Sequence, residues 1–333
     1  MSERRYDPTT GEWVTFATHR QDRTYKPPDD LCPLCPTHDP SRPTEIPRQH
    51  YEIAVFDNRF PSLSTDPPPP DLPGTELVPV EPAYGRCEVV VYSEDHHTTL
   101  AQAGRERIRL LVDVWADRWA VLGADRRVSY VLPFENKGEI IGVTLSHPHG
   151  QVYAYSDVPP RPLRELRAAQ AHRERTGRCV ECDVVAAEVA AEAADEARVV
   201  TRTGGVVAFV PQWARFPYEV HVVPLAHRTS VAALDAVERD EVADVLAAVL
   251  AGYDALFGFS MPYVLGIHSR PTDDAEDWDP VSHVHWEIAP PYRSADKIKF
   301  VAGSEMMGGA YLTDVAPEAA AERLRDAVAR AGR

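Results

Sequence analysis

The segment HPHGQ at residues 147–151 places two imidazoles two residues apart, followed by a glutamine. Histidine is the commonest metal ligand among side chains and also acts as a base or nucleophile. If the segment continues the apolar run 140–145 as a strand, His147 and His149 project from one face, because strand side chains alternate. Gly150 would then let the backbone approach a ligand phosphate. The alternative is a pair of surface imidazoles that flank a proline.

A C-x-x-C pair, Cys32 and Cys35, indicates either half of a zinc site or a redox dithiol. A thioredoxin-like dithiol would lie in a βαβ pattern, which this region lacks. Structural zinc requires four ligands of Cys or His type, and His96 and His147 can supply the other two. The pattern therefore favours a closed Cys2His2 zinc site.

Zinc bound to His147 would hold the chain in place and leave His149 fixed without making it a ligand. A fixed, neutral imidazole is a competent nucleophile toward phosphorus. Its attack on a nucleoside diphosphate sugar expels a sugar 1-phosphate, which is already a good leaving anion, so no strong general acid is required. The segment thus predicts transfer of a nucleotidyl group through His149.

These residues recur in two copies of one plan along the chain. The first half runs CPLC, EIAVF, CEVVVY, DHH and, after a helix, SHPHGQ. The second half runs CVEC, VVAFV, EVHVVP, AHR and, after a helix, SHVHWE. We therefore predict an α+β fold made of two similar halves, residues 1–160 and 161–333, each a mainly antiparallel sheet with a packed helix.

Each half contains an amphipathic helix that should cover its sheet. The apolar residues recur at three- and four-residue spacing, which is the stripe of a helix with one buried face. They are Ile108, Leu111, Val112, Trp115, Trp119 and Leu122 in the first half and Val242, Val245, Leu246, Val249, Leu250 and Tyr253 in the second. The short connection between the strand-like runs 206–210 and 219–224 favours antiparallel pairing.

The composition excludes some partners. A formal net charge of -16 over 333 residues would repel nucleic acid and an anionic membrane surface. No stretch approaches the ~20 apolar residues that span a bilayer, and the first residues lack the apolar region of a signal peptide. Together with cysteines arranged as C-x-x-C pairs, this predicts a cytoplasmic protein that binds neither membranes nor nucleic acid.

HPHGQ, preceded by CPLC, DHH and FENKG and followed by KFVAGSE, resembles the galactose-1-phosphate uridylyltransferase family of the histidine-triad superfamily. The resemblance runs from RRYDPTTGEW to PEAAAERLR. It implies exchange of UMP between UDP-glucose and galactose 1-phosphate through a uridylylated His149. It also implies that the partners are a UDP-sugar, a sugar 1-phosphate and a second copy of the chain.

The same resemblance implies the roles of further residues. Gln151 matches the residue that binds the nucleotidyl phosphoryl group in the covalent intermediate. The positions that match substrate-binding residues are Arg20, Arg23, Asn58 and Asn136 for the nucleotide or its phosphates, Thr144 beside the phosphates, and Lys299 and Glu305 near the hexose 1-phosphate. Three departures leave the sugar open: Ser146 replaces a proline, Tyr311 a glutamine and Thr144 a serine.

The second half permits two metal sites. The repeat predicts a second Cys2His2 zinc site from Cys179, Cys182, His227 and His283. The resemblance implies an alternative, because some relatives look to carry a metal site of one carboxylate and three histidines. Here the matching residues are Glu165, His268, His283 and His285. Because His283 is common to both, we expect only one to be filled, and zinc prefers the thiolates. The other alternative is that the second cysteine pair binds nothing.

Two other functions remain open from the sequence. A nucleoside-diphosphate-sugar phosphorylase, with inorganic phosphate as acceptor and adenosine in place of uridine, would use the same covalent histidine. An inactive nucleotide-binding or zinc-stabilised interaction module would keep the fold without the chemistry. The presence of both His149 and Gln151 favours an enzyme.

Overall fold

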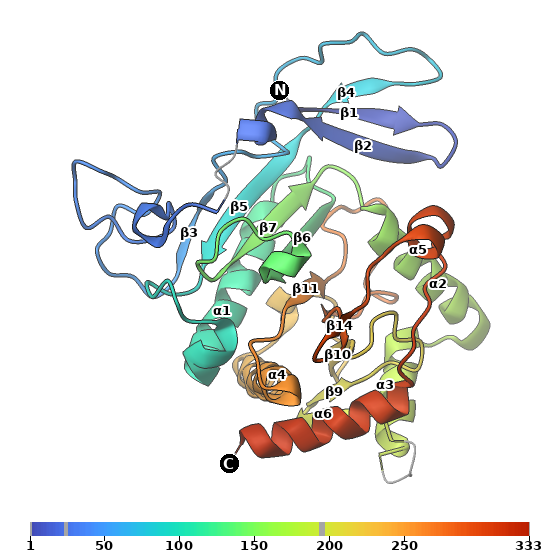
Figure 1. The fold of residues 1–333 in the computed structure, drawn as a ribbon. Coiled ribbons are helices and arrows are strands. Elements are labelled where there is room, and N and C mark those ends of the chain that lie inside the picture. The colour runs from blue at the N-terminus through green and yellow to red at the C-terminus, as the bar shows by residue number, and fades with distance from the viewer. Residues whose placement is uncertain (1, 23–25, 193–196, 333) are drawn as a thin grey trace.

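A nine-stranded sheet forms the centre of the structure, a computed structural model that describes residues 2–22, 26–192 and 197–332 (Figure 1). Neighbouring strands of this sheet pair antiparallel. In spatial order they are β3 (Ala54–Asp57), β5 (Gly85–Val91), β7 (His149–Tyr155), β6 (Tyr130–Lys137), β11 (Tyr263–His268), β12 (His285–Ala289), β10 (Val220–Pro224), β9 (Val206–Phe209) and β8 (Val199–Thr203).

The sheet repeats one four-strand plan about its centre. In the first half the spatial order is β3-β5-β7-β6, and in the second half the mirrored order is β11-β12-β10-β9. The central strands β6 and β11 pair from Tyr263 opposite Lys137 to Gly266 opposite Phe134. Each half inserts one long helix between its second and third strands, α1 (Leu100–Gly123) and α4 (Ala236–Phe257). The α+β class and the repeated plan are confirmed.

Three helices share one apolar core with the sheet. α1 packs on α4, and α4 packs on α6 (Pro317–Ala331), as Figure 1 shows. The apolar stripes predicted for α1 and α4 are buried, with Trp119 partly so. Burial of each such side chain contributes roughly 1.5–3 kcal/mol. Because this core contains residues from α1, α4 and strands of both halves, the two halves are not packed separately.

The loop that contains the first cysteine pair and the helices α2 (Pro160–Thr176) and α3 (Val180–Ala190) pack outside this core. Residues of the loop between Cys32 and Ile46 pack against Val89 and Val91 of β5. In the second half α3 packs against β9 and β10. The segment that joins the halves is the helix α2, whose Leu166 packs against Trp278. Both C-x-x-C pairs therefore adjoin apolar clusters separate from the core that contains α1 and α4.

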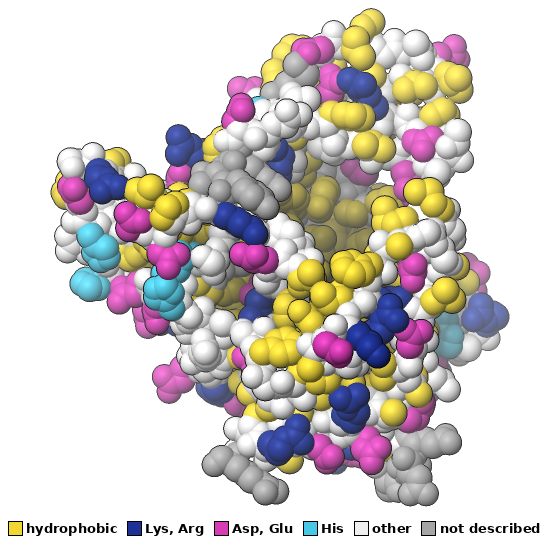
Figure 2. All heavy atoms as spheres, viewed as in Figure 1, with side chains coloured by type: hydrophobic (Ala, Val, Ile, Leu, Met, Phe, Trp, Pro, Cys, Tyr) yellow, Lys and Arg dark blue, Asp and Glu magenta, His cyan; other side chains and the backbone are white. Residues whose placement is uncertain are grey.

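The remaining elements lie outside the large sheet. A three-stranded sheet, at the top of Figure 1, has the order β2-β1-β4, and Figure 2 shows a hollow with hydrophobic side chains below it. The Pro-rich stretch 61–73 contains no helix or strand. No helix in the described ranges is both long and apolar enough to cross a bilayer. The remaining elements are β1 (Ser2–Asp7), β2 (Glu12–Ala17), β4 (Val80–Pro82), β13 (Tyr292–Ser294), β14 (Lys297–Ile298), α5 (Gly303–Gly308), and the 3-10 helices η1 (Thr18–Asp22), η2 (Asp29–Leu31), η3 (Glu139–Ile141) and η4 (Val231–Ala233).

Two details of the HPHGQ segment differ from the prediction. β7 begins at His149, and the preceding run is η3 followed by Gly142 in the left-handed region at φ 87°, so His147 is not in a strand. A Cβ added to Gly150 would lie only 2.0 Å from the Tyr92 hydroxyl. Gly150 therefore makes room for Tyr92 rather than for a phosphate on that side.

Candidate active site and metal clusters

The His149 imidazole is fixed in one tautomer by a backbone carbonyl. Its Nδ1 lies 2.7 Å from the His147 carbonyl oxygen, so Nδ1 carries the proton and donates it. Nε2 is then left with a free lone pair. Burial lowers the pKa of His149, and its bond to the His147 carbonyl offsets this only in part. At neutral pH the side chain is thus an oriented, uncharged imidazole with the free lone pair that a nucleophile requires.

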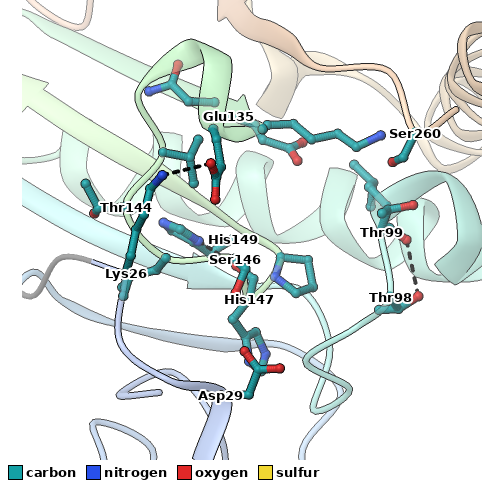
Figure 3. A pocket seen from close by; sticks show the side chains of 18 of the residues that line it. Lys26, Asp29, Thr98, Thr99, Glu135, Thr144, Ser146, His147, His149 and Ser260 are labelled. Atoms are coloured by element: carbon teal, nitrogen blue, oxygen red, sulfur yellow. Dashed lines mark hydrogen bonds and ion pairs between the residues drawn. The ribbon is translucent and has the colours of Figure 1, made fainter. Parts of the chain in front are cut away.

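His149 lines two cavities at once. The larger has a volume of about 460 Å³ and is shown in Figure 3. The narrower has a volume of about 140 Å³. Thr144 and Leu145 also line both, so the loop 142–148 forms the boundary between them. Two different ligand groups can therefore meet at this one imidazole.

The narrower cavity combines apolar walls with a polar end. Asn58 Nδ2 donates to Gln151 Oε1 at 3.3 Å, and Asn58 Oδ1 accepts from the Phe60 amide at 2.9 Å. With its oxygen engaged, the Gln151 amide nitrogen is left to donate to a ligand. Arg20 donates to the Tyr153 hydroxyl at 3.1 Å and lines the same cavity. The apolar walls come from Pro33, Leu34, Phe56, Phe60, Val89 and Leu145.

The larger cavity contains the polar and cationic side chains that suit a phosphorylated ligand. Lys26, Asn136 and Lys137 line it together with His149. The Lys26 ammonium lies 2.7 Å from Glu139, and the Lys137 ammonium lies 3.3 Å from Asp254. These ion pairs hold the two cations in place. Asp29, Glu135 and Glu139 also line this cavity, so it presents carboxylates as well as the two cations to a ligand.

Two predicted substrate residues, Lys299 and Glu305, do not lie beside His149 in the described part of the chain. Lys299 Nζ lies 2.9 Å from Glu305 Oε1 and also contacts the Leu312 carbonyl. The Lys299 ammonium lowers the pKa of Glu305 to about 2. Neither residue lines the two cavities that contain His149. Arg23 lies outside the described residues.

The first Cys2His2 cluster has the arrangement that a tetrahedral metal ion requires. Cys32, Cys35, His96 and His147 bring their ligand atoms within 4.8 Å of one another. Cys35 Sγ lies 3.3 Å from His96 Nδ1 and 3.5 Å from His147 Nδ1. His147 Nε2 donates to the Ser93 carbonyl at 2.7 Å, which leaves Nδ1 for a metal. Burial and the neighbouring Cys32 raise the pKa of Cys35 to about 12, so a cation is needed to hold its thiolate.

The second Cys2His2 cluster repeats this geometry. Cys179, Cys182, His227 and His283 also lie within 4.8 Å of one another. Cys182 Sγ is 3.5 Å from Nδ1 of both histidines, and their Nε2 atoms donate to backbone carbonyls at 2.9 and 3.0 Å. Burial and the neighbouring Cys179 raise the pKa of Cys182 to about 12. Both predicted clusters could therefore hold a metal ion.

The predicted competition for His283 is wrong. Its Nδ1 faces Cys182, whereas Glu165, His268 and His285 form a separate cluster without it. In that cluster the Glu165 carboxylate lies 2.8 Å from His268 Nδ1. The error arose because the sequence does not show which neighbour a histidine side chain faces. The two arrangements can coexist.

His285 occupies the place of His149 in the second half but has a different neighbour. Its Nδ1 donates to the His283 carbonyl at 2.9 Å, as in the first half. Two residues further, Glu287 stands where the first half has Gln151. Although burial raises the pKa of Glu287, His268 and other cations lower it overall to about 2. A buried carboxylate in this position repels a phosphate, so only the first half has the features of a nucleotidyl-transfer site.

Several residues that line the cavities are not among those predicted from the sequence. Lys137 directly follows Asn136 in FENKG, and Phe60 ends FDNRF, so both adjoin predicted residues. Lys26 and Asp29 carried no local signal, because only the folded chain brings them beside residues 144–149.

The fold and site together define a duplicated α+β protein with one reactive imidazole and two Cys2His2 clusters. Residues 1–159 match the family model of the galactose-1-phosphate uridyl transferase N-terminal domain, and residues 166–331 match that of the C-terminal domain. The chain belongs to the galactose-1-phosphate uridylyltransferase family.

Relatives cover nearly the whole chain. The galactose-1-phosphate uridylyltransferase of Thermotoga maritima is 37% identical over 98% of each chain, and that of Streptomyces lividans is 37% identical over 98% of this chain and 87% of its own. A solved uridylyltransferase structure has a TM-score of 0.84 at 30% identity and covers 98% of this chain and 99% of its own. An ADP-glucose phosphorylase from Arabidopsis thaliana shares the fold, with a TM-score of 0.72 at 23% identity over 98% of both chains.

Proposed function

We propose that this protein transfers a uridylyl group from UDP-glucose to galactose 1-phosphate through a covalent intermediate on His149. Family membership over the full length supports the activity, which is that of a UDP-glucose:hexose-1-phosphate uridylyltransferase. The observation that carries the mechanism is the bond from His149 Nδ1 to the His147 carbonyl, which leaves Nε2 free to attack.

The chemistry divides into two displacements at the same phosphorus. Nε2 of His149 forms a bond to the α-phosphorus of UDP-glucose, and the bond from that phosphorus to the bridging oxygen breaks, releasing glucose 1-phosphate. A phosphate oxygen of galactose 1-phosphate then attacks the uridylyl-histidine, and the P–N bond breaks to give UDP-galactose and free His149. Because attacking and leaving phosphates are already anions, neither step requires a strong acid or base.

The two cavities divide the substrate between them. The narrower cavity suits the uridine, since its apolar walls can pack on a flat base while Arg20 and Asn58 supply polar contacts. Gln151 donates its amide to the transferred phosphoryl group, where charge develops. The larger cavity takes the sugar 1-phosphate, with Asn136 and Thr144 beside the phosphates. Arg23, Lys299 and Glu305 stay proposed substrate residues on the family resemblance alone, since neither Lys299 nor Glu305 lines these two cavities.

Zinc is the metal that the donor sets favour. Two thiolates and two imidazole nitrogens form the usual closed structural site. Cys32, Cys35, His96 and His147 would hold one ion, and Cys179, Cys182, His227 and His283 a second. The first ion would fix the chain at His147, two residues before the proposed nucleophile.

The proposed working form is a cytoplasmic homodimer. Thiols placed as metal ligands suit a reducing compartment. Between β14 and α6 the chain exposes Phe300, Met306, Met307 and Leu312, each more than 60% accessible. Such a run of apolar side chains suits contact with a second copy of the chain. Light scattering, which measures the molar mass in solution, tests this assembly. The wild-type protein should have the mass of a dimer, and a Met307→Lys variant should be more monomeric.

Mass spectrometry of the intact protein tests the covalent mechanism. UDP-glucose alone should add one UMP to His149, and galactose 1-phosphate should remove it with formation of UDP-galactose. His149→Ala should abolish both events while the metal content stays unchanged. Initial rates should follow ping-pong patterns, whereas a requirement for both substrates before any glucose 1-phosphate is released contradicts the proposal. ADP-glucose with inorganic phosphate, tried in parallel, separates a phosphorylase from a transferase.

A further inference from the structure

We propose that the Ser146 hydroxyl binds the phosphate of the sugar 1-phosphate in the larger cavity and is oriented for this by the metal-facing His96. This inference rests on the proposed function. It assigns a donor at a position where the family resemblance leads one to expect proline, which has neither a hydroxyl nor an N–H.

The direction of the hydrogen bond at Ser146 follows from the metal cluster. His96 Nδ1 faces Cys35 Sγ at 3.3 Å, so a metal held by this cluster binds His96 through Nδ1. Nε2 must then carry the ring proton, since a neutral imidazole has only one. Nε2 lies 2.9 Å from Ser146 Oγ, which therefore accepts. The serine's own proton remains available for another acceptor.

That proton can reach the cavity of the nucleophile. Ser146 is exposed and lines the larger cavity together with His149, and Figure 3 shows its side chain beside those of His147 and His149. Among the described residues, His96 is the only hydrogen-bond partner of the Ser146 side chain. The hydroxyl can thus turn its proton toward a ligand without breaking a bond inside the protein.

Asp29 is the second group near the His96 ring and cannot replace Ser146. Its carboxylate lies 3.2 Å from His96 Nε2, lines the same cavity and is well exposed. A carboxylate only accepts hydrogen bonds and repels phosphate, whereas a hydroxyl that already accepts can donate. Lys26 and Lys137 line the same cavity and can supply positive charge to a phosphate, which Asp29 cannot do.

Steady-state kinetics of three variants test the inference. Ser146→Ala should raise the KM for galactose 1-phosphate roughly 10-fold to 100-fold, because a hydrogen bond to a charged group is lost. Ser146→Thr, which keeps the hydroxyl, should restore most of this loss. Ser41→Ala is the matched control and should leave this KM unchanged, since Ser41 is also an exposed serine but lines neither cavity that contains His149.

Two further readouts separate binding from structure. Zinc per chain and the extent of UMP labelling by UDP-glucose should match wild type in Ser146→Ala. An unchanged KM for galactose 1-phosphate overturns the inference, and so does zinc loss in Ser146→Ala that accounts for the change. If wild-type protein acquires no UMP at all, the proposed function fails first, so the two failures are distinguishable.

Discussion

At the scale of single residues, a backbone carbonyl and not a carboxylate orients His149, the proposed nucleophile. The His147 carbonyl fixes the His149 tautomer without adding a negative charge beside the phosphates. His285 has the same carbonyl bond, but Glu165 and Glu287 surround it with carboxylates. Two imidazoles in equivalent backbone settings thus differ in chemistry because of their neighbours alone.

Glu135 provides a pH-dependent test of stability. Burial raises its pKa to about 7, although Lys137 and the Tyr263 hydroxyl oppose this. Between pH 4.5 and 7 the folded protein keeps a proton that the unfolded chain has lost, so this residue makes stability fall as pH rises through that window. Glu135→Gln removes this dependence. The variant's free energy of unfolding relative to wild type should rise by about 3 kcal/mol between pH 4.5 and pH 7.5.

Urea unfolding at the two pH values measures this difference. Glu76→Gln is the control, because Glu76 is exposed and its substitution should leave the pH dependence as in wild type. Parallel pH profiles for wild type and Glu135→Gln would contradict the assignment.

At the scale of elements, the start of β7 joins a metal ligand to the nucleophile. His147 belongs to the first cluster, and His149 is the first residue of the strand. His147→Ala should therefore lose one metal ion, stability and UMP labelling together, because a metal site contributes folding free energy directly. Cys182→Ser should also lose one metal ion but keep most UMP labelling, since the second cluster lies in the other half.

Elemental analysis of both variants beside wild type checks this. About two zinc ions per wild-type chain are expected. One zinc ion per chain would contradict a zinc site at the second cysteine pair, and iron retained in Cys182→Ser would place a metal at Glu165, His268 and His285.

Helices and repeats could be predicted from the sequence, but turns and side-chain directions could not. The apolar stripes of α1 and α4 were predictable from the spacing of apolar residues alone, and these residues are buried as that spacing predicts. The strand expected through His147 failed because Gly142 and Gly138 adopt left-handed backbone angles that end the extended run. The separation of His283 from the Glu165 cluster depends on packing between distant segments. Local periodicity carries no information about such contacts.

The whole molecule is organised by one sheet that both halves share. We propose that residues 1–160 and 161–333 are repeat units and not independent domains, because β6 and β11 join them and the core contains residues of both. Leu265→Ala, in buried β11, should destabilise the protein by roughly 3 kcal/mol. This loss of stability should appear equally in the two halves.

Hydrogen exchange distinguishes repeat units of one domain from independent domains. It is followed in β5 and β7 of the first half and in β10 and β12 of the second half. Protection should fall in all four strands, whereas a fall confined to the second half would indicate domains that unfold separately. Val237→Ala, on the exposed side of α4, is the control and should change neither half.

The position of His149 between two cavities also determines stereochemistry at phosphorus. In the proposed function the narrower cavity keeps the uridine while the larger one exchanges its sugar 1-phosphate, and the His149 imidazole lines both cavities. Each displacement then inverts the configuration of the transferred phosphorus, because the entering and leaving groups lie on opposite sides of it. Two inversions give net retention, so a chiral phosphorothioate donor should yield product of unchanged handedness, whereas direct transfer between the sugars would invert it once.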